Sequence, residues 1–233
     1  MPLAYITGGS RGLGYATASA LKAHGFDLVL FSKNEALLRT SAHNLSANFE
    51  VVDCEDVIKT REVFESAIDK YGIPDVLILA HGVMTERTAK TLRTNDSEWS
   101  RVLNINLNSV FTIINVVGSR MSDQRNGRVI VYSACLGRMS GPGTAGGLAP
   151  YRISKAGVNA LVRNLAHETG HGSRGLWVDA ICPNHSRTDM GGPDAPRSAE
   201  EGAATAVWLA TREVIHGQTQ TGLLWEDNAV VPW

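Results

Sequence analysis

Two residues one helical turn apart have the chemistry of a proton-transfer pair. Tyr151 and Lys155 are four positions apart in the segment Tyr-Arg-Ile-Ser-Lys, so on a helix their side chains lie on one face. A phenol is a poor acid at neutral pH because its reference pKa is about 10. A neighbouring ammonium lowers that pKa, and proton transfer is most efficient when the pKa approaches the operating pH. The spacing therefore predicts acid–base catalysis by Tyr151, tuned by Lys155.

A glycine-rich loop near the start of the chain has the composition of a phosphate-binding turn. Residues 7–14 read Thr-Gly-Gly-Ser-Arg-Gly-Leu-Gly and follow a short apolar run. Glycines let the backbone approach a pyrophosphate closely, and the N-terminus of a following helix supplies free N–H groups. The loop predicts a dinucleotide site with contacts from Gly8, Ser10, Arg11, Gly12, Leu13 and Gly14.

Both motifs resemble those of the short-chain dehydrogenase/reductase family. Thr-Gly-x-x-x-Gly-x-Gly is similar to its cofactor loop, Tyr-x-x-Ser-Lys-Ala-Gly is similar to its catalytic segment, and the C-terminal residues resemble the carbonyl-reductase-like branch. The resemblance implies that Tyr151 exchanges the substrate proton while Lys155 holds the nicotinamide ribose. It also implies that Asn106, inside a predicted helix, supports a water-linked proton relay to Lys155. A purely structural role for this amide is the alternative, since a buried Asn needs hydrogen-bond partners.

The end of the second predicted strand favours NADP(H) over NAD. The run Phe-Ser-Lys-Asn contains Ser32 and Lys33 but no acid, and Arg11 adds a second cation. An acid at this place would bind the ribose 2′-hydroxyl of NAD, whereas a cation suits the 2′-phosphate of NADP. The alternative is that both cations are solvated surface charges. Asp53 resembles the adenine-contacting Asp of the family, or it caps the next helix.

Several residues around the expected site depart from the family pattern. Ala134 occupies the position of the usual catalytic serine, and losing one such donor costs about 10²–10³ in rate. Ser140 or Thr144 in the following loop could replace it, or could be ordinary loop polarity. His81 and His185 follow strand ends and could supply acid–base chemistry, or could be hydrogen-bonded walls of the cleft. By resemblance, further cofactor contacts come from Ala80, Gly82, Pro183 and Thr188.

The elements that must position these residues alternate along the chain. Apolar runs predict strands at 3–7, 27–31, 49–52, 75–79, 128–132, 176–181 and 223–225. Helical periodicity predicts helices at 12–24, 34–46, 56–71, 97–123, 150–168 and 199–211. This alternation predicts a single doubly wound α/β Rossmann domain over residues 1–233, with a parallel sheet of about seven strands covered by helices on both faces.

Composition excludes several classes of partner. The formal net charge of −1 gives no electrostatic footprint for nucleic acid or an anionic membrane. We expect no membrane span, no signal peptide and a cytoplasmic location. Cys54, Cys135 and Cys182 lack the spacing of disulfide or zinc frameworks, so we expect no metal and three small buried hydrophobes. The family resemblance implies a homodimer or homotetramer formed through the two long helices.

These features favour an NADPH-dependent carbonyl reductase, or the reverse alcohol oxidation, acting on a small metabolite. A second hypothesis keeps the cofactor but changes the chemistry to reduction of another unsaturated group, dehydration or isomerisation in a biosynthetic pathway. A third is a non-catalytic NADP(H)-binding protein. Retention of Tyr151, Lys155 and Asn106 argues against the third hypothesis.

Overall fold

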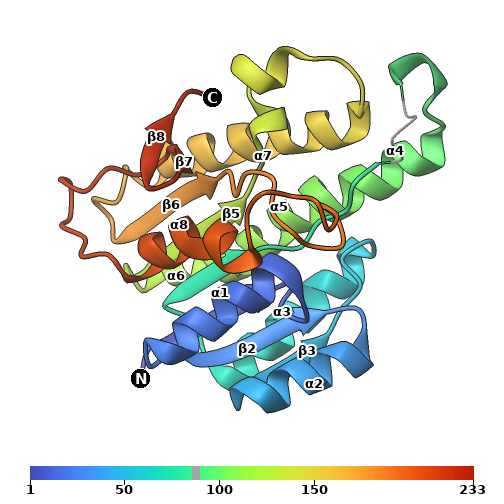
Figure 1. Ribbon diagram of the computed structural model, residues 1–233. Helices are drawn as coiled ribbons and strands as arrows, with labels where there is room; N and C mark the ends of the chain where they lie inside the picture. The colour runs from blue at the N-terminus through green and yellow to red at the C-terminus, as the bar shows by residue number, and fades with distance from the viewer. Residues whose placement is uncertain (86–89) are drawn as a thin grey trace.

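A mostly parallel sheet forms the centre of the molecule. The computed structural model describes residues 1–85 and 90–233 (Figure 1). The described residues form an eight-stranded sheet in the order β3-β2-β1-β4-β5-β6-β7-β8. The strands are β1 (Leu3–Thr7), β2 (Asp27–Ser32), β3 (Asn48–Val51), β4 (Val76–Leu79), β5 (Gly127–Tyr132), β6 (Leu176–Ile181), β7 (Leu224–Glu226) and β8 (Ala229–Val231). The order reverses between β1 and β4, where open α/β sheets bind their ligands.

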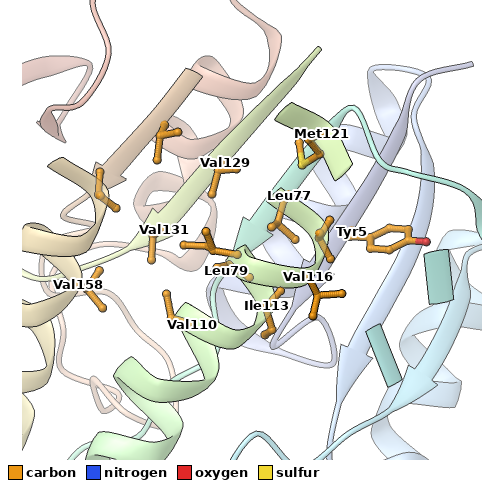
Figure 2. Packing of buried hydrophobic residues seen from close by; sticks show 14 of the residues in the cluster. Tyr5, Leu77, Leu79, Val110, Ile113, Val116, Met121, Val129, Val131 and Val158 are labelled. Carbon is orange, nitrogen blue, oxygen red and sulfur yellow. The ribbon is translucent and has the colours of Figure 1, made fainter. Parts of the chain in front are cut away.

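Helices cover both faces because the central strands are apolar on both sides. The principal helices are α1 (Gly12–Ala23), α2 (Glu35–Leu45), α3 (Val57–Tyr71), α4 (Asp96–Leu103), α5 (Ser109–Ile113), α6 (Ser119–Asp123), α7 (Ala149–Glu168) and α8 (Ala199–Thr211). One face of the sheet packs against α1, α2 and α8, and the other against α3, α5, α6 and α7. In Figure 2, Leu77 and Leu79 of β4 point from the sheet toward Val110 and Ile113 of α5. These are alternate residues of one strand, as the strand period requires.

The predicted α/β architecture is confirmed, but the sheet has one strand more than expected. β8 pairs antiparallel with β7, whereas the prediction was a parallel sheet ending near residue 225. The two strands are joined by Asp227 and Asn228, which both adopt positive φ angles of 51° and 61°. Two such residues form the tight turn that matches the twist of a hairpin. An Asp-Asn pair between two short apolar runs was the signal for this strand.

The helix predicted over residues 97–123 forms, with two local irregularities. It runs from α4 to α6 through two π-helical turns, η2 (Asn104–Asn108) and η3 (Ile114–Gly118). Asn95 caps its start by accepting a 2.8 Å hydrogen bond from the Glu98 amide. The segment Asp96–Asp123 is long and apolar enough to cross a membrane by length and composition alone. However, 61% of its most apolar window is buried inside the protein, as in a core helix.

Candidate active site

Two adjoining cavities lie at the carboxyl ends of the parallel strands. A cavity of about 240 Å³ follows the glycine loop and the ends of β2 and β3, and one of about 440 Å³ contains Tyr151 and Lys155. Both cavities are lined by Leu13, Ala80, His81, Gly82, Thr188 and Met190. Because they share these walls, the two form one elongated site that runs from the glycine loop to the tyrosine.

The first turn of α7 brings Tyr151 and Lys155 into the larger cavity. The chain enters α7 through Leu148, which adopts a left-handed φ of 54°, and Pro150 occupies the first turn, where its missing N–H costs nothing. Tyr151 and Lys155 are only 6% and 5% exposed, respectively. The Lys155 Nζ atom donates a 2.7 Å hydrogen bond to the carbonyl of Tyr132, at the end of β5. That contact fixes the ammonium against the floor of the site.

Burial dominates the ionisation of both groups. It lowers the pKa of Lys155 to about 8, because an ammonium loses hydration inside the protein. It also raises the pKa of Tyr151, with smaller contributions from electrostatic interactions with Cys135 and Cys182. The expectation that Lys155 lowers the pKa of Tyr151 is therefore not met in this structure. The phenol is protonated at neutral pH, which is the form that can donate a proton.

Asn106 is completely buried and holds the segment that follows β4. Its Oδ1 atom accepts a 2.8 Å hydrogen bond from the Val83 amide, and its Nδ2 atom donates to the Val83 carbonyl at 2.9 Å and to Ser154 Oγ at 3.1 Å. Asn106 lies in the π-helical turn η2, a feature that is frequent at functional sites. The side chain thus joins the central helix, the β4 loop and the first turn of α7.

The glycine loop leaves no room for side chains at its closest approaches. A Cβ atom on Gly14 would lie 2.3 Å from the carbonyl oxygen of Gly8. Outside this loop, after β4, a Cβ atom on Gly82 would make a tight contact, 3.3 Å from Asn106 Oδ1 and 3.6 Å from Lys155 Nζ. Gly8 and Gly12 adopt positive φ angles of 65° and 56°. The backbone is therefore compact and open toward the smaller cavity. This cradle fits the pyrophosphate of a dinucleotide.

Two cations lie along the rim of the smaller cavity, and each faces an acid. Arg11 forms an ion pair with Asp189, and Lys33 Nζ lies 3.9 Å from Asp53 Oδ2. All four side chains are more than half exposed, so these pairs are weak and can exchange for a phosphate.

Asp53 does not cap the next helix. Asp56 does so, through bonds to the amides of residues 58 and 59.

Ser10 and Ser32 connect the glycine loop to the end of β2. Their hydroxyl oxygens lie 2.9 Å apart, and both residues line the smaller cavity. The loop and the strand end therefore form a continuous polar wall beside Lys33.

Ala134 lines the larger cavity together with Tyr151, and the neighbouring hydroxyl points elsewhere. Ser133 Oγ donates a 2.5 Å hydrogen bond to Asn159 Oδ1 on α7. The loop residues do not replace the missing donor in this conformation. Ser140 lies outside the residues that line the cavity, and its Oγ bonds the carbonyl of Trp233, while Thr144 bonds the carbonyl of Gly141.

His81 is a half-buried group whose two ring nitrogens are both hydrogen-bonded. Ser109 Oγ donates to the Ile105 carbonyl at 2.7 Å and therefore accepts from His81 Nε2 at 2.8 Å. His81 Nδ1, which lies 2.6 Å from Thr7 Oγ1, then accepts that hydroxyl proton. Burial, with help from the charge of Lys155, lowers the pKa of His81 to about 3. This neutral ring matches the expectation of a hydrogen-bonded wall rather than a proton donor.

The segment after β6 forms the opposite wall. Pro183 lines the larger cavity, and Thr188 lines both. His185 also lines the larger cavity, but it is exposed and its Nε2 atom bonds the carbonyl of Gly191 at 2.8 Å.

Several lining residues were not predicted from the sequence. Met84 and Met190 add flexible apolar surface to the larger cavity, and Asp189 bonds Arg11 across the mouth of the smaller one. Cys135 was expected to be a buried hydrophobe, but it is only partly buried and lines the larger cavity. The position of Cys135 directly after Ala134, near the end of a strand, is the sequence feature that could have indicated its place in the cavity.

Comparisons with known proteins agree with this geometry. A model of the short chain dehydrogenase family matches residues 2–199. The chain is 30% identical over 190 residues to the 3-oxoacyl-[acyl-carrier-protein] reductase FabG of Escherichia coli, covering 81% of this chain and 75% of that protein. It is also 30% identical over 197 residues to the 3-oxoacyl-[acyl-carrier-protein] reductase of Synechocystis, with the same coverage.

Solved structures show the same fold. A ribose-5-phosphate isomerase from Brucella melitensis superposes with a TM-score of 0.83 at 25% identity, covering 96% of this chain and 89% of that one. A blue fluorescent protein from a metagenomic library, solved in complex with NADPH, has a TM-score of 0.83 at 24% identity and covers 96% and 94%. The family match spans most of the chain and contains both the glycine loop and the Tyr-Lys pair. The chain belongs to the short chain dehydrogenase family of oxidoreductases.

Proposed function

We propose that this protein is an NADPH-dependent reductase of a ketone in a small, partly apolar metabolite. The observation that supports it most is the continuity of the two cavities, with the glycine cradle at one end and Tyr151 at the other. Arg11, Ser32 and Lys33 would bind the 2′-phosphate, with Asp53 beside the adenine. The nicotinamide would then lie near Thr188, Pro183 and Gly82. Bound NADPH would supply the hydride that reduces the carbonyl carbon.

The chain's own residues would transfer the proton and orient the cofactor and the catalytic segments. Tyr151 carries a proton at neutral pH and would donate it to the carbonyl oxygen. Lys155 would hold the ribose and, being positively charged below about pH 8, would stabilise the phenolate left behind. Asn106 would keep the β4 loop and the α7 turn in register through its three hydrogen bonds.

The lining of the larger cavity favours a substrate with an apolar chain. Leu13, Met84, Leu136, Leu148 and Met190 surround Tyr151 in a volume of about 440 Å³. The bacterial relatives are 3-oxoacyl-[acyl-carrier-protein] reductases, whose substrates carry a ketone on an acyl chain. We therefore propose 3-oxoacyl thioesters or related ketones as the substrate class, and a biosynthetic role.

Ala134 favours a second candidate function. Without the usual serine hydroxyl, the cavity holds one donor fewer for a developing oxyanion. A reaction that needs less oxyanion stabilisation, such as reduction of another unsaturated group, is the alternative.

We also propose that the protein is cytoplasmic and forms a homodimer or homotetramer.

The test is NADPH oxidation with a panel of 3-oxoacyl thioesters and simple ketones. The proposal predicts that turnover with NADPH exceeds turnover with NADH. It also predicts that Tyr151→Phe lowers the rate of ketone reduction by a factor of about 10²–10⁴. The variant should retain NADPH binding, because it removes only the hydroxyl group. Tight NADPH binding without turnover on any ketone, in wild type and variant alike, would refute the reductase and leave the alternative chemistry.

A further inference from the structure

Two cysteines meet beside Tyr151 in a way that neither fold nor family explains. Cys135 follows β5, and Cys182 follows β6, its parallel neighbour in the sheet. Both side chains line the larger cavity with Tyr151. Cys182 is 2% exposed, whereas Cys135 is only partly buried. The pair therefore has one thiol open to the cavity and one beneath it.

The two thiols lie close enough to shift each other's ionisation. Their interaction is the largest cause of both shifts: it lowers the pKa of Cys135 to about 6 and raises the pKa of Cys182. The Cys182 sulfur also donates a hydrogen bond to Asn184 Oδ1, at 4.0 Å. Burial and the carboxylate of Glu226 oppose the shift at Cys135, and the guanidinium of Arg138 supports it. The pair therefore favours a Cys135 thiolate beside a Cys182 thiol that keeps its proton.

A thiolate exposed to a cavity has the environment of a reactive cysteine rather than a structural one. Cys54 provides the contrast within the same chain. It is 8% exposed, and burial raises its pKa to about 12. The thiols of one protein thus differ in both exposure and ionisation.

We propose that Cys135 is a site of covalent modification inside the active-site cavity, with Cys182 as its resolving thiol. With hydrogen peroxide as oxidant, the Cys135 sulfur attacks one peroxide oxygen, the O–O bond breaks, and one water leaves as Cys135 becomes a sulfenic acid. Cys182 then attacks that sulfur, the S–S bond forms, and a second water leaves. The two thiols lose two electrons, and the peroxide gains them.

Modification of Cys135 would change the electrostatic environment of Tyr151. The charge of the Cys135 thiolate contributes to the raised pKa of Tyr151, so this group lies close enough to act on the phenol. Oxidation removes that charge, and a bulky adduct on Cys135 would occupy substrate space. We expect oxidised or alkylated protein to lose turnover.

The experiment uses mass spectrometry of the intact protein to follow modification of its cysteines, so it does not depend on knowing the substrate. The proteins compared are wild type, Cys135→Ser, Cys182→Ser and Cys54→Ser. Hydrogen peroxide should give wild type a Cys135–Cys182 disulfide that dithiothreitol reverses, and Cys54→Ser should behave identically. Cys182→Ser should stop at a sulfenic acid on Cys135, trapped by dimedone.

Iodoacetamide gives a second readout on unmutated protein. At neutral pH it should label Cys135 at least about tenfold faster than Cys54, because only Cys135 combines exposure with thiolate character. The pH midpoint of labelling at Cys135 should rise by about one unit or more in Cys182→Ala, which removes the polar side chain altogether. Equal labelling of Cys135 and Cys54 in wild type would overturn the proposal. A sulfenic acid that persists on wild-type Cys135 would refute the resolving role of Cys182.

Discussion

The ammonium nitrogen of Lys155 lies 5.9 Å from the centre of the Tyr151 ring, one turn further along α7. A second contact, to the carbonyl of Tyr132, ties the same ammonium to the end of β5. The lysine therefore connects the helix that carries the phenol to the centre of the sheet. Because burial lowers the pKa of Lys155 to about 8, the charge that supports Tyr151 is lost within an accessible pH range.

This lowered pKa predicts an alkaline limit to ketone reduction. Tyr151 has a raised pKa and stays protonated, so the limit comes from Lys155, which loses its charge as pH rises through about 8. We expect kcat/KM for reduction to fall about tenfold per pH unit above that value. Lys155→Met should remove most activity at every pH. A rate that stays constant to pH 10 would contradict this assignment.

The glycine cradle predicts a sharp contrast between two substitutions to alanine. In Gly14→Ala the new Cβ atom would lie 2.3 Å from the Gly8 carbonyl oxygen, so the loop must move. We expect a loss of about 1–3 kcal/mol of stability and at least tenfold weaker NADPH binding. Gly146→Ala is the matched control, since nothing lies within 4 Å of its Cβ position. Thermal melts and NADPH fluorescence titration measure both effects, and equal behaviour of the two variants would refute the close approach.

The sequence predicts those parts of this fold whose signals are local and periodic. The seven strands of the α/β core follow apolar runs, and the start of α7 follows from Pro150 and the Tyr-Lys spacing. The glycine loop is predictable because its chemistry lies in consecutive residues. β8 was missed because it is only three residues long and depends on the Asp227–Asn228 turn.

The rest depends on contacts between distant residues. The roles of His81 and Ser133 follow from their partners Ser109 and Asn159, which lie 28 and 26 positions away. The meeting of Cys135 with Cys182 requires that β5 and β6 be neighbours, which no local pattern encodes. Ionisation was the weakest inference, because burial rather than the ammonium sets the pKa of Tyr151.

Ala134→Ser tests whether the missing hydroxyl limits ketone reduction. Ala134 lines the cavity beside Tyr151, so a serine there could donate a hydrogen bond to the substrate oxygen. We expect kcat on simple ketones to rise, by up to about 10²-fold. Ala134→Val adds bulk without a donor and should lower the rate. A serine variant no faster than wild type on any ketone would mean that another group already provides this contact.

Two exposed apolar side chains on the long helices predict the oligomeric contact. Phe111 on α5 and Ile153 on α7 are 52% and 44% exposed. Burying the exposed half of each in a subunit interface would contribute roughly 0.8–1.5 kcal/mol. We expect light scattering to show a dimer or tetramer that Phe111→Asp or Ile153→Asp dissociates. Ile58→Asp on α3 should leave the assembly unchanged, although Ile58 is 73% exposed. A wild-type monomer would contradict this prediction.

The neutral His81 ring predicts that the protein loses stability in mild acid. Burial lowers the pKa of His81 to about 3, whereas in the unfolded chain it is about 6.5. Between these values the unfolded state binds a proton that the folded state does not. The free energy of unfolding should therefore be highest above pH 6.5 and fall by up to about 1.4 kcal/mol per pH unit as the pH decreases.

The control for this prediction is His81→Asn, which removes the titrating ring and keeps a polar group between Thr7 and Ser109. Other groups, such as Asp179 with a pKa raised to about 6, titrate in both proteins and cancel in the difference. Urea unfolding at pH 7.5 and pH 5 should show a larger loss for wild type than for the variant, by about 1–2 kcal/mol. Equal losses would mean that His81 takes up a proton in the folded state near its ordinary pKa. In that case the chain of hydrogen bonds from Thr7 through His81 to Ser109 would not hold the ring neutral.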